Sequence, residues 1–207
     1  RYFLKKSSEE NMESIILASA SPRRQEILKM LNIPFQVIIP DVDESFDEKI
    51  DLFKVPEYLA VKKVNGCLAM LPKERIVPWV LGADTLVCYN QKLYGKPSSA
   101  QKAFEYLKEL QGNQHFVISS IALYNGRSEK TVTATNVTKV KFKPMSDNEI
   151  NWYIETGEWH GVAAGYRLQG LASCFIEEIQ GSMSSVIGLP ISNLYDMLNS
   201  QGYSILE

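Results

Sequence analysis

Several features that mark particular classes of protein are missing from this sequence. No apolar run in the chain approaches the ~20 residues of a membrane-spanning helix. Positive charge is not in excess either, because 22 Lys and Arg residues stand against 24 Asp and Glu residues, a formal net charge of −2. Nucleic acids and anionic membrane surfaces favour a basic partner, so we expect binding to neither.

Cysteine and histidine are also scarce. The three cysteines, Cys67, Cys88 and Cys174, are far apart and form no CxxC pair. An odd number of cysteines without disulfide spacing is typical of free thiols in a reducing compartment. No apolar signal segment is recognisable near the start, so we expect a cytoplasmic protein. Nothing near His115 or His160 completes a metal site or a catalytic triad, which favours structural roles for both.

Nothing in the sequence divides the chain into separate units. It has no internal repeat, low-complexity tract or linker rich in Pro, Gly and Ser, so we expect one domain. We expect residues 1–11 to be a polar overhang or an added segment, and residues 12–207 to form the domain, with Met12 as a credible start. The 45% hydrophobic and 22% charged content is that of an ordinary globular protein.

Hydrophobic periodicity predicts helices alternating with strands, followed by an antiparallel segment. The expected helices are 22–32, 56–71, 98–110, 146–157 and 190–198. The expected strands are 14–19, 35–40, 76–82, 86–89, 92–94, 116–124, 131–142 and 173–179. Ser146 and Glu149 have the spacing of a capping box, and Asn90 and Gln91 that of a hairpin turn. Together these segments predict an α/β fold with a mixed central sheet.

The segment 19–24, SASPRR, lies where the first expected strand ends and the first helix begins. A helix N-terminus offers unpaired N–H groups and favours anions, and Arg23 and Arg24 add bidentate donors for phosphate oxygens. The Gly-rich run and GK[ST] of a Walker loop are absent. Spacing alone does not separate a phosphate site from an ordinary helix cap followed by two solvated arginines.

The segment 82–85, GADT, follows an apolar strand. An Asp at the carboxyl end of a strand lies where α/β sheets place ligands, and there Asp84 could bind a metal or act as a base on water. The alternative is an Asp that opens a turn before the hairpin.

An acidic run follows the second expected strand and contains Asp41, Asp43, Glu44, Asp47 and Glu48. Carboxylates that leave a strand in this way can converge on a hard cation such as Mg²⁺ or Mn²⁺. The simpler interpretation is a solvated loop. A metal bridging these carboxylates to phosphates is favoured only if phosphates bind at the arginines.

Three lysines and two segments rich in small residues complete the candidates. Lys62 and Lys63 lie on an expected helix, and Lys96 lies in a tight Gly–Lys–Pro loop near the hairpin. Segments 165–170 and 181–190 could form a close-fitting floor for the edge of a ring. These candidates comprise cations that could bind phosphate, carboxylates that could bind a metal and an acidic residue that could activate water. Together they point to phosphoester or phosphoanhydride chemistry.

The sequence resembles the Maf family of nucleoside triphosphate pyrophosphatases over nearly its whole length, from Ile15 to Tyr203. The matching motifs are specific in combination. They are LASASPRR at 17–24, DVDE at 41–44, LAVKK at 59–63, GADT at 82–85, GKP at 95–97, VTKVKF at 137–142, GYRLQG at 165–170 and GLP at 188–190.

This resemblance implies a fold, a reaction and a set of partners. The fold would be an elongated, single α/β domain with a twisted mixed sheet, similar to inosine-triphosphatase-like enzymes. The reaction would cleave a nucleoside triphosphate between its α and β phosphates, giving the monophosphate and pyrophosphate, with a divalent Mg²⁺ or Mn²⁺. A house-cleaning role against non-standard nucleotides, a cytoplasmic location and a homodimer are further expectations of the family.

The family's functional positions carry over residue by residue. Asp84 matches the proton acceptor and, together with Glu44, the metal ligands. Base specificity falls to Arg23, Thr85 and Gln169. The phosphate-binding positions are Ser19, Ser21, Arg24, Lys63 and Lys96, and Thr138 is a pocket position.

One departure concerns the loop at 164–170, where dTTP- and UTP-hydrolysing members usually read GAYGIQG and this chain carries the bulky Arg167. SPRR with Thr85 and Gln169 favours dTTP and UTP over 7-methyl-GTP. Arg167 changes base or phosphate contacts only if it points inward. A regulatory or binding module in cell-division arrest is the alternative from another class. A dinucleotide-binding oxidoreductase is disfavoured because GxGxxG is absent.

Overall fold

A computed structural model describes residues 12–72 and 77–206, so the expected overhang at 1–11 and Ile76 of one expected strand lie outside the described residues. Its core is a seven-stranded sheet in the order β2-β1-β3-β5-β6-β7, with β4 paired to β3. The strands are β1 Ile15–Leu17, β2 Phe35–Val37, β3 Trp79–Tyr89, β4 Lys92–Tyr94, β5 Gln114–Asn125, β6 Lys130–Phe142 and β7 Ile176–Gln180. β1 pairs in parallel with β2 and β3, and the other pairs are antiparallel, so the expected mixed sheet is confirmed.

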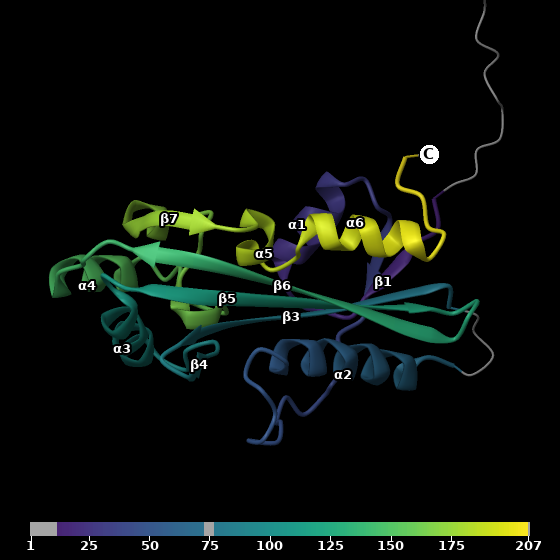
Figure 1. Cartoon of the computed structure of the whole chain (residues 1–207), viewed down its shortest axis with the longest axis horizontal. Coiled ribbons are helices and arrows are strands. Elements are labelled where there is room, and N and C mark those ends of the chain that lie inside the picture. Colours follow the sequence, from purple (N-terminus) through teal and green to yellow (C-terminus); the bar gives the residue numbers. More distant parts are fainter. Residues whose placement is uncertain (1–11, 73–76, 207) are drawn as a thin grey trace, which may run out of the picture.

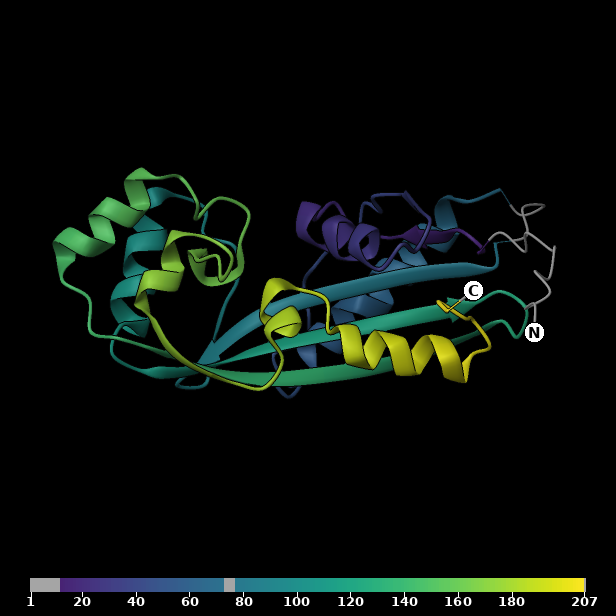
Figure 2. The ribbon, with the colours of Figure 1, turned by 90° about the horizontal axis from the view of Figure 1, so that it is seen from above.

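Helices cover both faces of this sheet (Figure 1). The helices are α1 Pro22–Met30, α2 Val55–Met70, α3 Ala100–Leu110, α4 Asp147–Glu155, α5 Met183–Ile187 and α6 Ile191–Ser200, with 3₁₀ turns at Ala163–Gly165 and Leu171–Phe175. α1 and α6 lie on one face, and α2 lies on the other. The long strands β3, β5 and β6 run the length of the molecule, and α3 and α4 gather at one end (Figure 2). The elongated α/β fold is therefore confirmed.

Three groups of buried side chains hold these layers together. One lies under α1 and α6 and includes Leu28, Leu81 and Leu194. A second lies under α2, where Val64 packs toward the opposite face of the sheet. The third fills the end formed by α3 and α4 and contains Tyr153. Because helices cover both faces of the sheet, its central strands β3 and β5 are buried along most of their length.

Gly82 allows α2 to pack very close to β3. A Cβ atom at this position would come within 2.4 Å of the backbone oxygen of Ala60 and 2.8 Å of a methyl group of Val64. Any larger residue would push the helix away from the strand. This close contact brings Lys63 of α2 to Asp84, two residues beyond Gly82 in β3.

The structure corrects both interpretations of the GADT segment. β3 is one continuous strand, paired with β5 from Trp79 opposite Asn125 to Cys88 opposite Phe116. Asp84 therefore lies in the middle of a strand, neither at its carboxyl end nor in a turn. The expected break fails because unbroken pairing with β5 outweighs the local turn preference of Gly and Asp. The parallel pairing with β1 does end at Leu81, so Asp84 lies just beyond the carboxyl end of that neighbour.

Of the other local predictions, the capping box and the hairpin are confirmed, and one strand begins later than predicted. The capping box of Ser146 and Glu149 is confirmed, and the hairpin turns at Asn90 and Gln91, both with positive φ. The strand expected at 173–179 begins only at Ile176, because the preceding residues form a 3₁₀ turn. The five-residue helix α5 was not foreseen. All three cysteines are free, and within the described ranges no helix is long and apolar enough to cross a membrane.

Candidate active site

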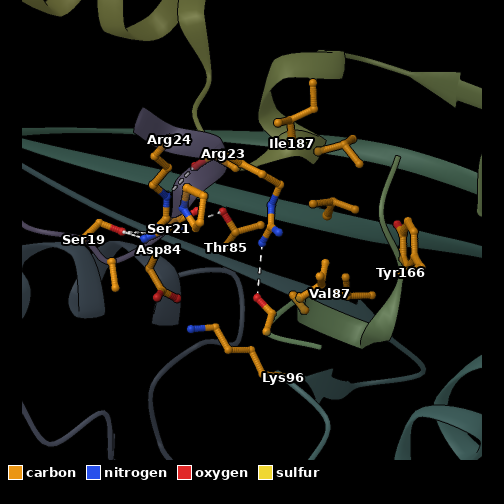
Figure 3. Close-up of a pocket in the computed structure, with 18 of the residues that line it drawn as sticks. Ser19, Ser21, Arg23, Arg24, Asp84, Thr85, Val87, Lys96, Tyr166 and Ile187 are labelled. Carbon is orange, nitrogen blue, oxygen red and sulfur yellow. Dashed lines mark hydrogen bonds between the residues drawn. The ribbon is translucent and has the colours of Figure 1, made fainter. Parts of the chain in front are cut away.

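A cavity of about 280 Å³ opens where segments distant in the sequence meet (Figure 3). Its lining comes from the β1–α1 junction, α2, β3, the Gly95–Pro97 loop, the turn at Ala163–Gly165 and the end of α5. Seven residues singled out from the sequence line this cavity together with Arg23. They are Ser19, Ser21, Arg24, Lys63, Asp84, Thr85 and Lys96.

Arg24 is buried at one wall of this cavity, with 8% of its surface exposed. Its guanidinium donates from Nη1 to Ser19 Oγ at 2.8 Å, from Nε to the carbonyl of Gly188 at 2.9 Å and from Nη2 to Thr85 Oγ1 at 3.3 Å. Burial lowers the pKa of Arg24, while the charge of Asp84 raises it. All three acceptors are neutral, so the positive charge remains available to an anion in the cavity.

The N-terminus of α1 opens on the same wall. Pro22 occupies its first turn, and the side chain of the N-cap residue Ser21 makes no capping hydrogen bond. The backbone N–H of Ser21 donates to Ser19 Oγ at 3.3 Å, which fixes the turn that leads into the helix. An uncapped helix N-terminus beside a guanidinium favours a bound anion.

Asp84 faces the cavity from β3 with 7% of its surface exposed. Its Oδ1 accepts a hydrogen bond from Lys63 Nζ at 2.5 Å, and Lys63 also lies 3.0 Å from Glu44 Oε1. The other carboxylate oxygen, Oδ2, is buried without a hydrogen-bond partner among the described residues. A buried, unpaired carboxylate oxygen is costly, and a bound water, proton donor or cation would satisfy it.

The acidic run does not converge on a metal site. In the parts of the chain that the structure describes, no group of three or more His, Cys, Asp and Glu residues could hold an ion. Asp43 and Asp47 instead accept hydrogen bonds from backbone N–H groups two residues on. Only Glu44 reaches the site. Burial raises its pKa, but the charge and hydrogen bond of Lys63, with the charges of Lys96 and Arg24, outweigh this and lower it.

Two carboxylates that meet at Lys63, beside a cavity lined by cationic side chains, do fit a hard divalent ion. Mg²⁺ is usually held by one or two carboxylates, with waters and substrate phosphates completing its coordination. Glu44 and Asp84 supply that number, and carboxylate oxygens are hard ligands. The residues present therefore match the cation that the family resemblance implies.

Lys96 stands on the opposite side from the arginines, and its side chain points toward Asp84 in Figure 3. It is exposed and forms no ion pair or hydrogen bond within 12–72 and 77–206. The loop that carries it is tied to the far end of the molecule by Ala164, whose N–H donates to the carbonyl of Gly95 at 2.9 Å. Lys96 is thus a free cation on an anchored loop.

The three positions expected to read the base are divided between two adjacent cavities, and Arg23 lines both. Arg23 lines the cavity and donates from Nη2 to the carbonyl of Gly161 at 3.3 Å. Gln169 is exposed and lines an adjacent cavity of about 270 Å³ that also contains Arg23. Thr138 lines neither of these two cavities. It is fully buried and hydrogen-bonds both the N–H and the carbonyl of Ser182, so its side chain supports the loop before α5.

Sequence reasoning missed a chain of hydroxyl groups behind the site. Thr85 Oγ1 lies 2.7 Å from Ser119 Oγ, and Ser119 Oγ donates to the carbonyl of Ser185 at 2.6 Å. Two adjacent serines, Ser119 and Ser120, in a strand of Val and Ile were the available signal. A polar residue inside such a strand needs a partner, and Ser119 finds one in Thr85 of the cavity wall, whereas Ser120 pairs with Thr135 of β6.

Tyr166, in the segment 165–170 expected to form a floor of the site, lines both cavities. Its hydroxyl lies 2.8 Å from Nε2 of His115, and the two rings meet edge to face. Burial lowers the pKa of His115 to about 4. The neutral imidazole therefore serves as a structural support for this wall, as expected for a histidine without metal or triad partners.

The fold and this cavity define an α/β protein whose polar groups are arranged to bind phosphate beside an acid. Residues 14–201 match the family described as Maf-like protein, and the chain belongs to that family. The dTTP/UTP pyrophosphatase of Desulforamulus reducens is 42% identical over 94% of this chain and 100% of its own length. That of Treponema denticola is 40% identical with the same coverage. Among solved structures, the Staphylococcus aureus Ham1 protein superposes with a TM-score of 0.43 and 15% identity, over 63% of this chain and 72% of that one.

Proposed function

We propose that this protein is a nucleoside triphosphate pyrophosphatase that cleaves between the α and β phosphates. One observation carries the proposal: Asp84, whose carboxylate has a buried and unpaired oxygen, lines a cavity together with Arg24, Lys63 and Lys96. The relatives named as dTTP/UTP pyrophosphatases match the chain along nearly its whole length. An acid among cations is the arrangement that phosphoanhydride hydrolysis needs.

The phosphate chain would lie between the α1 N-terminus and Lys96. Arg24 is fixed by three hydrogen bonds before any ligand arrives, so it stabilises developing negative charge without having to reorganise. Lys96 is free to approach the opposite side of the phosphates. Ser19 Oγ accepts a hydrogen bond from the N–H of Ser21 and so fixes the turn that would lie beside the same oxygens.

Asp84 would orient the attacking water and accept its proton at Oδ2. The water oxygen bonds to the α phosphorus, the bond to the bridging oxygen breaks, and pyrophosphate leaves with that oxygen. Lys63 holds Oδ1 and so keeps the carboxylate turned toward the cavity. Glu44 and Asp84 would hold a divalent Mg²⁺ or Mn²⁺, which neutralises phosphate charge and makes a bound water more acidic.

For the base, we propose dTTP and UTP as the preferred substrates. Gln169 carries both a donor and an acceptor, which suits the O4 and N3–H groups of thymine and uracil. Arg23 lines both its cavity and the cavity of the proposed phosphate site, and Thr85 lines the latter. A preference for 7-methyl-GTP, or a regulatory role without catalysis, are the competing functions. We further propose a cytoplasmic enzyme of residues 12–207 that cleans the nucleotide pool and pairs as a homodimer.

The deciding experiment offers the purified protein each common and modified nucleoside triphosphate with Mg²⁺ or Mn²⁺ and separates the products. We expect UTP and dTTP to yield monophosphate and pyrophosphate. Release of a nucleoside diphosphate and inorganic phosphate would contradict the proposed cleavage between the α and β phosphates. Absence of any turnover would favour the binding module, and rapid cleavage of 7-methyl-GTP would move the chain to the other base class.

A further inference from the structure

The adjacent cavity continues the first one past Arg23. The two cavities share residues of α1, residues on either side of the turn at Ala163–Gly165 and residues of α5, among them the apolar Val162, Val186 and Ile187. Beyond these shared residues the second cavity is lined by Glu26, Arg167, Leu168 and Gln169. A nucleotide with its phosphates beside Asp84 would extend over the apolar strip and present the edge of its base to this polar end.

Arg167 is held in this second cavity by its backbone. Its N–H donates to the hydroxyl of the buried Tyr153 at 3.1 Å. Its side-chain Nε is buried yet has no hydrogen-bond partner, and within the described part of the chain the guanidinium forms no ion pair. A buried donor left unpaired is costly, so an oxygen acceptor is missing at this point.

The neighbouring arginine differs in this respect. Arg23 donates to the carbonyl of Gly161, and its pKa is lowered by burial and then by the charge of Arg167, with Glu26 acting in the opposite direction. Two guanidinium groups therefore border one cavity. Only Arg167 has a buried N–H without an acceptor, and it alone of the two lies in the second cavity but not in the first.

We propose that Arg167 determines base specificity by donating a hydrogen bond to a carbonyl oxygen on the base, so that the enzyme selects 4-oxo over 4-amino pyrimidines. The inference rests on the proposed function. A guanidinium has only donors and cannot accept from an amino group. The side-chain amide of Gln169 can rotate, so it can donate to the 4-oxo group of uracil or accept from the 4-amino group of cytosine. By itself it does not exclude cytosine. Arg167 supplies the fixed donor that does.

The test measures kcat/KM for UTP, CTP and the triphosphate of 2-pyrimidinone riboside, which carries neither an oxo nor an amino group at position 4. We expect the wild-type protein to prefer UTP over both. In Arg167→Gln the UTP-to-CTP ratio should fall about ten- to a hundred-fold, the size of one hydrogen bond to a charged group. Arg167→Lys keeps a donor without an acceptor and should retain a clear preference for UTP.

Arg127→Gln is the matched control, because Arg127 is exposed, pairs with Glu13 at 2.6 Å and lines neither cavity. Its UTP-to-CTP ratio should equal that of the wild-type protein. An unchanged ratio in Arg167→Gln, or wild-type protein that cleaves CTP as well as UTP, overturns the role of Arg167 and leaves the pyrophosphatase intact. Wild-type protein that releases no pyrophosphate from any triphosphate overturns the proposed function and this inference with it.

Discussion

Two arginines adjacent in the sequence, Arg23 and Arg24, lie in opposite surroundings. Arg24 is buried and donates three hydrogen bonds to fixed acceptors from three parts of the chain. Arg23 is partly exposed, makes one longer hydrogen bond and faces the repulsion of Arg167. The proposed phosphate end of the site is thus fixed before a ligand binds, whereas the proposed base end has a donor whose partner a ligand would supply. Such a division lets one phosphate-cleaving site serve different bases by changes at the base end alone.

The largest effect should come from Asp84→Asn, which tests the phosphate end at its centre. The substitution keeps the size of the side chain but removes its ability to accept a proton. We expect turnover to fall by about 10²- to 10⁴-fold, the usual contribution of a general base. Pyrophosphate release measures this, and a cooperative thermal transition checks the fold. Activity near the wild-type level would remove Asp84 from the proposed mechanism.

Arg24→Ala and Arg23→Ala compare the two ends directly. Arg24→Ala leaves three acceptors without their donor, which should cost about 1–3 kcal/mol of unfolding free energy and lower kcat/KM about ten- to a hundred-fold. Arg23→Ala should change the unfolding free energy by less than about 0.5 kcal/mol, as surface substitutions usually do. Urea unfolding and kinetics on the same preparations give both quantities. Equal losses of unfolding free energy in the two variants would contradict the contrast between the fixed surroundings of Arg24 and the open surroundings of Arg23.

The wall shared by the two cavities should respond to pH through His115. Burial lowers the pKa of its folded state to about 4, below the unfolded value of about 6.5. Between these values the unfolded chain binds the additional proton, so the folded state should lose up to about 3 kcal/mol as the pH falls from 6.5 to 4. Urea unfolding across this range is the measurement. His115→Phe should flatten the curve, while His160→Gln, at an exposed histidine, should not.

The smallest effect is expected at the exposed Gln169. Removing one neutral hydrogen bond costs about 1 kcal/mol, so Gln169→Ala should lower kcat/KM for UTP roughly five-fold and reduce the preference over other bases. The unfolding free energy should stay unchanged because Gln169 lies at the surface. A substrate profile identical to that of the wild-type protein would restrict base reading to the remaining residues of the second cavity.

Local patterns predicted most of the fold. Helical periodicity located α2 and α3, and β-branched runs located β5 and β6, because these segments are long and their buried faces repeat regularly. The prediction for the GADT segment was wrong because this segment is short and its conformation depends on pairing with a distant strand. Its Gly and Asp favour a turn locally, but β3 is kept extended by a partner more than thirty residues away, paired residue by residue.

The site was harder to anticipate than the fold. Glu44, Lys63 and Asp84 lie in three separate segments, and only the packing of α2 against Gly82 brings them into contact. Motif matching gives positions but not directions, so it placed Thr138 at a pocket although its side chain turns into the loop before α5. The orientation of Arg167 likewise depends on the contact of its backbone with Tyr153, which no spacing in the sequence reveals.

The hydroxyl chain behind the site has a direction. A carbonyl oxygen has no hydrogen, so the proton of Ser119 must point to Ser185, and the proton of Thr85 must then point to Ser119. Arg24 donates to one lone pair of Thr85, and the other lone pair remains. Toward the cavity, Thr85 can therefore accept a hydrogen bond but cannot give one. The chain of hydroxyl groups therefore selects for hydrogen-bond donors. A ligand group that contacts Thr85 has to donate the hydrogen bond itself.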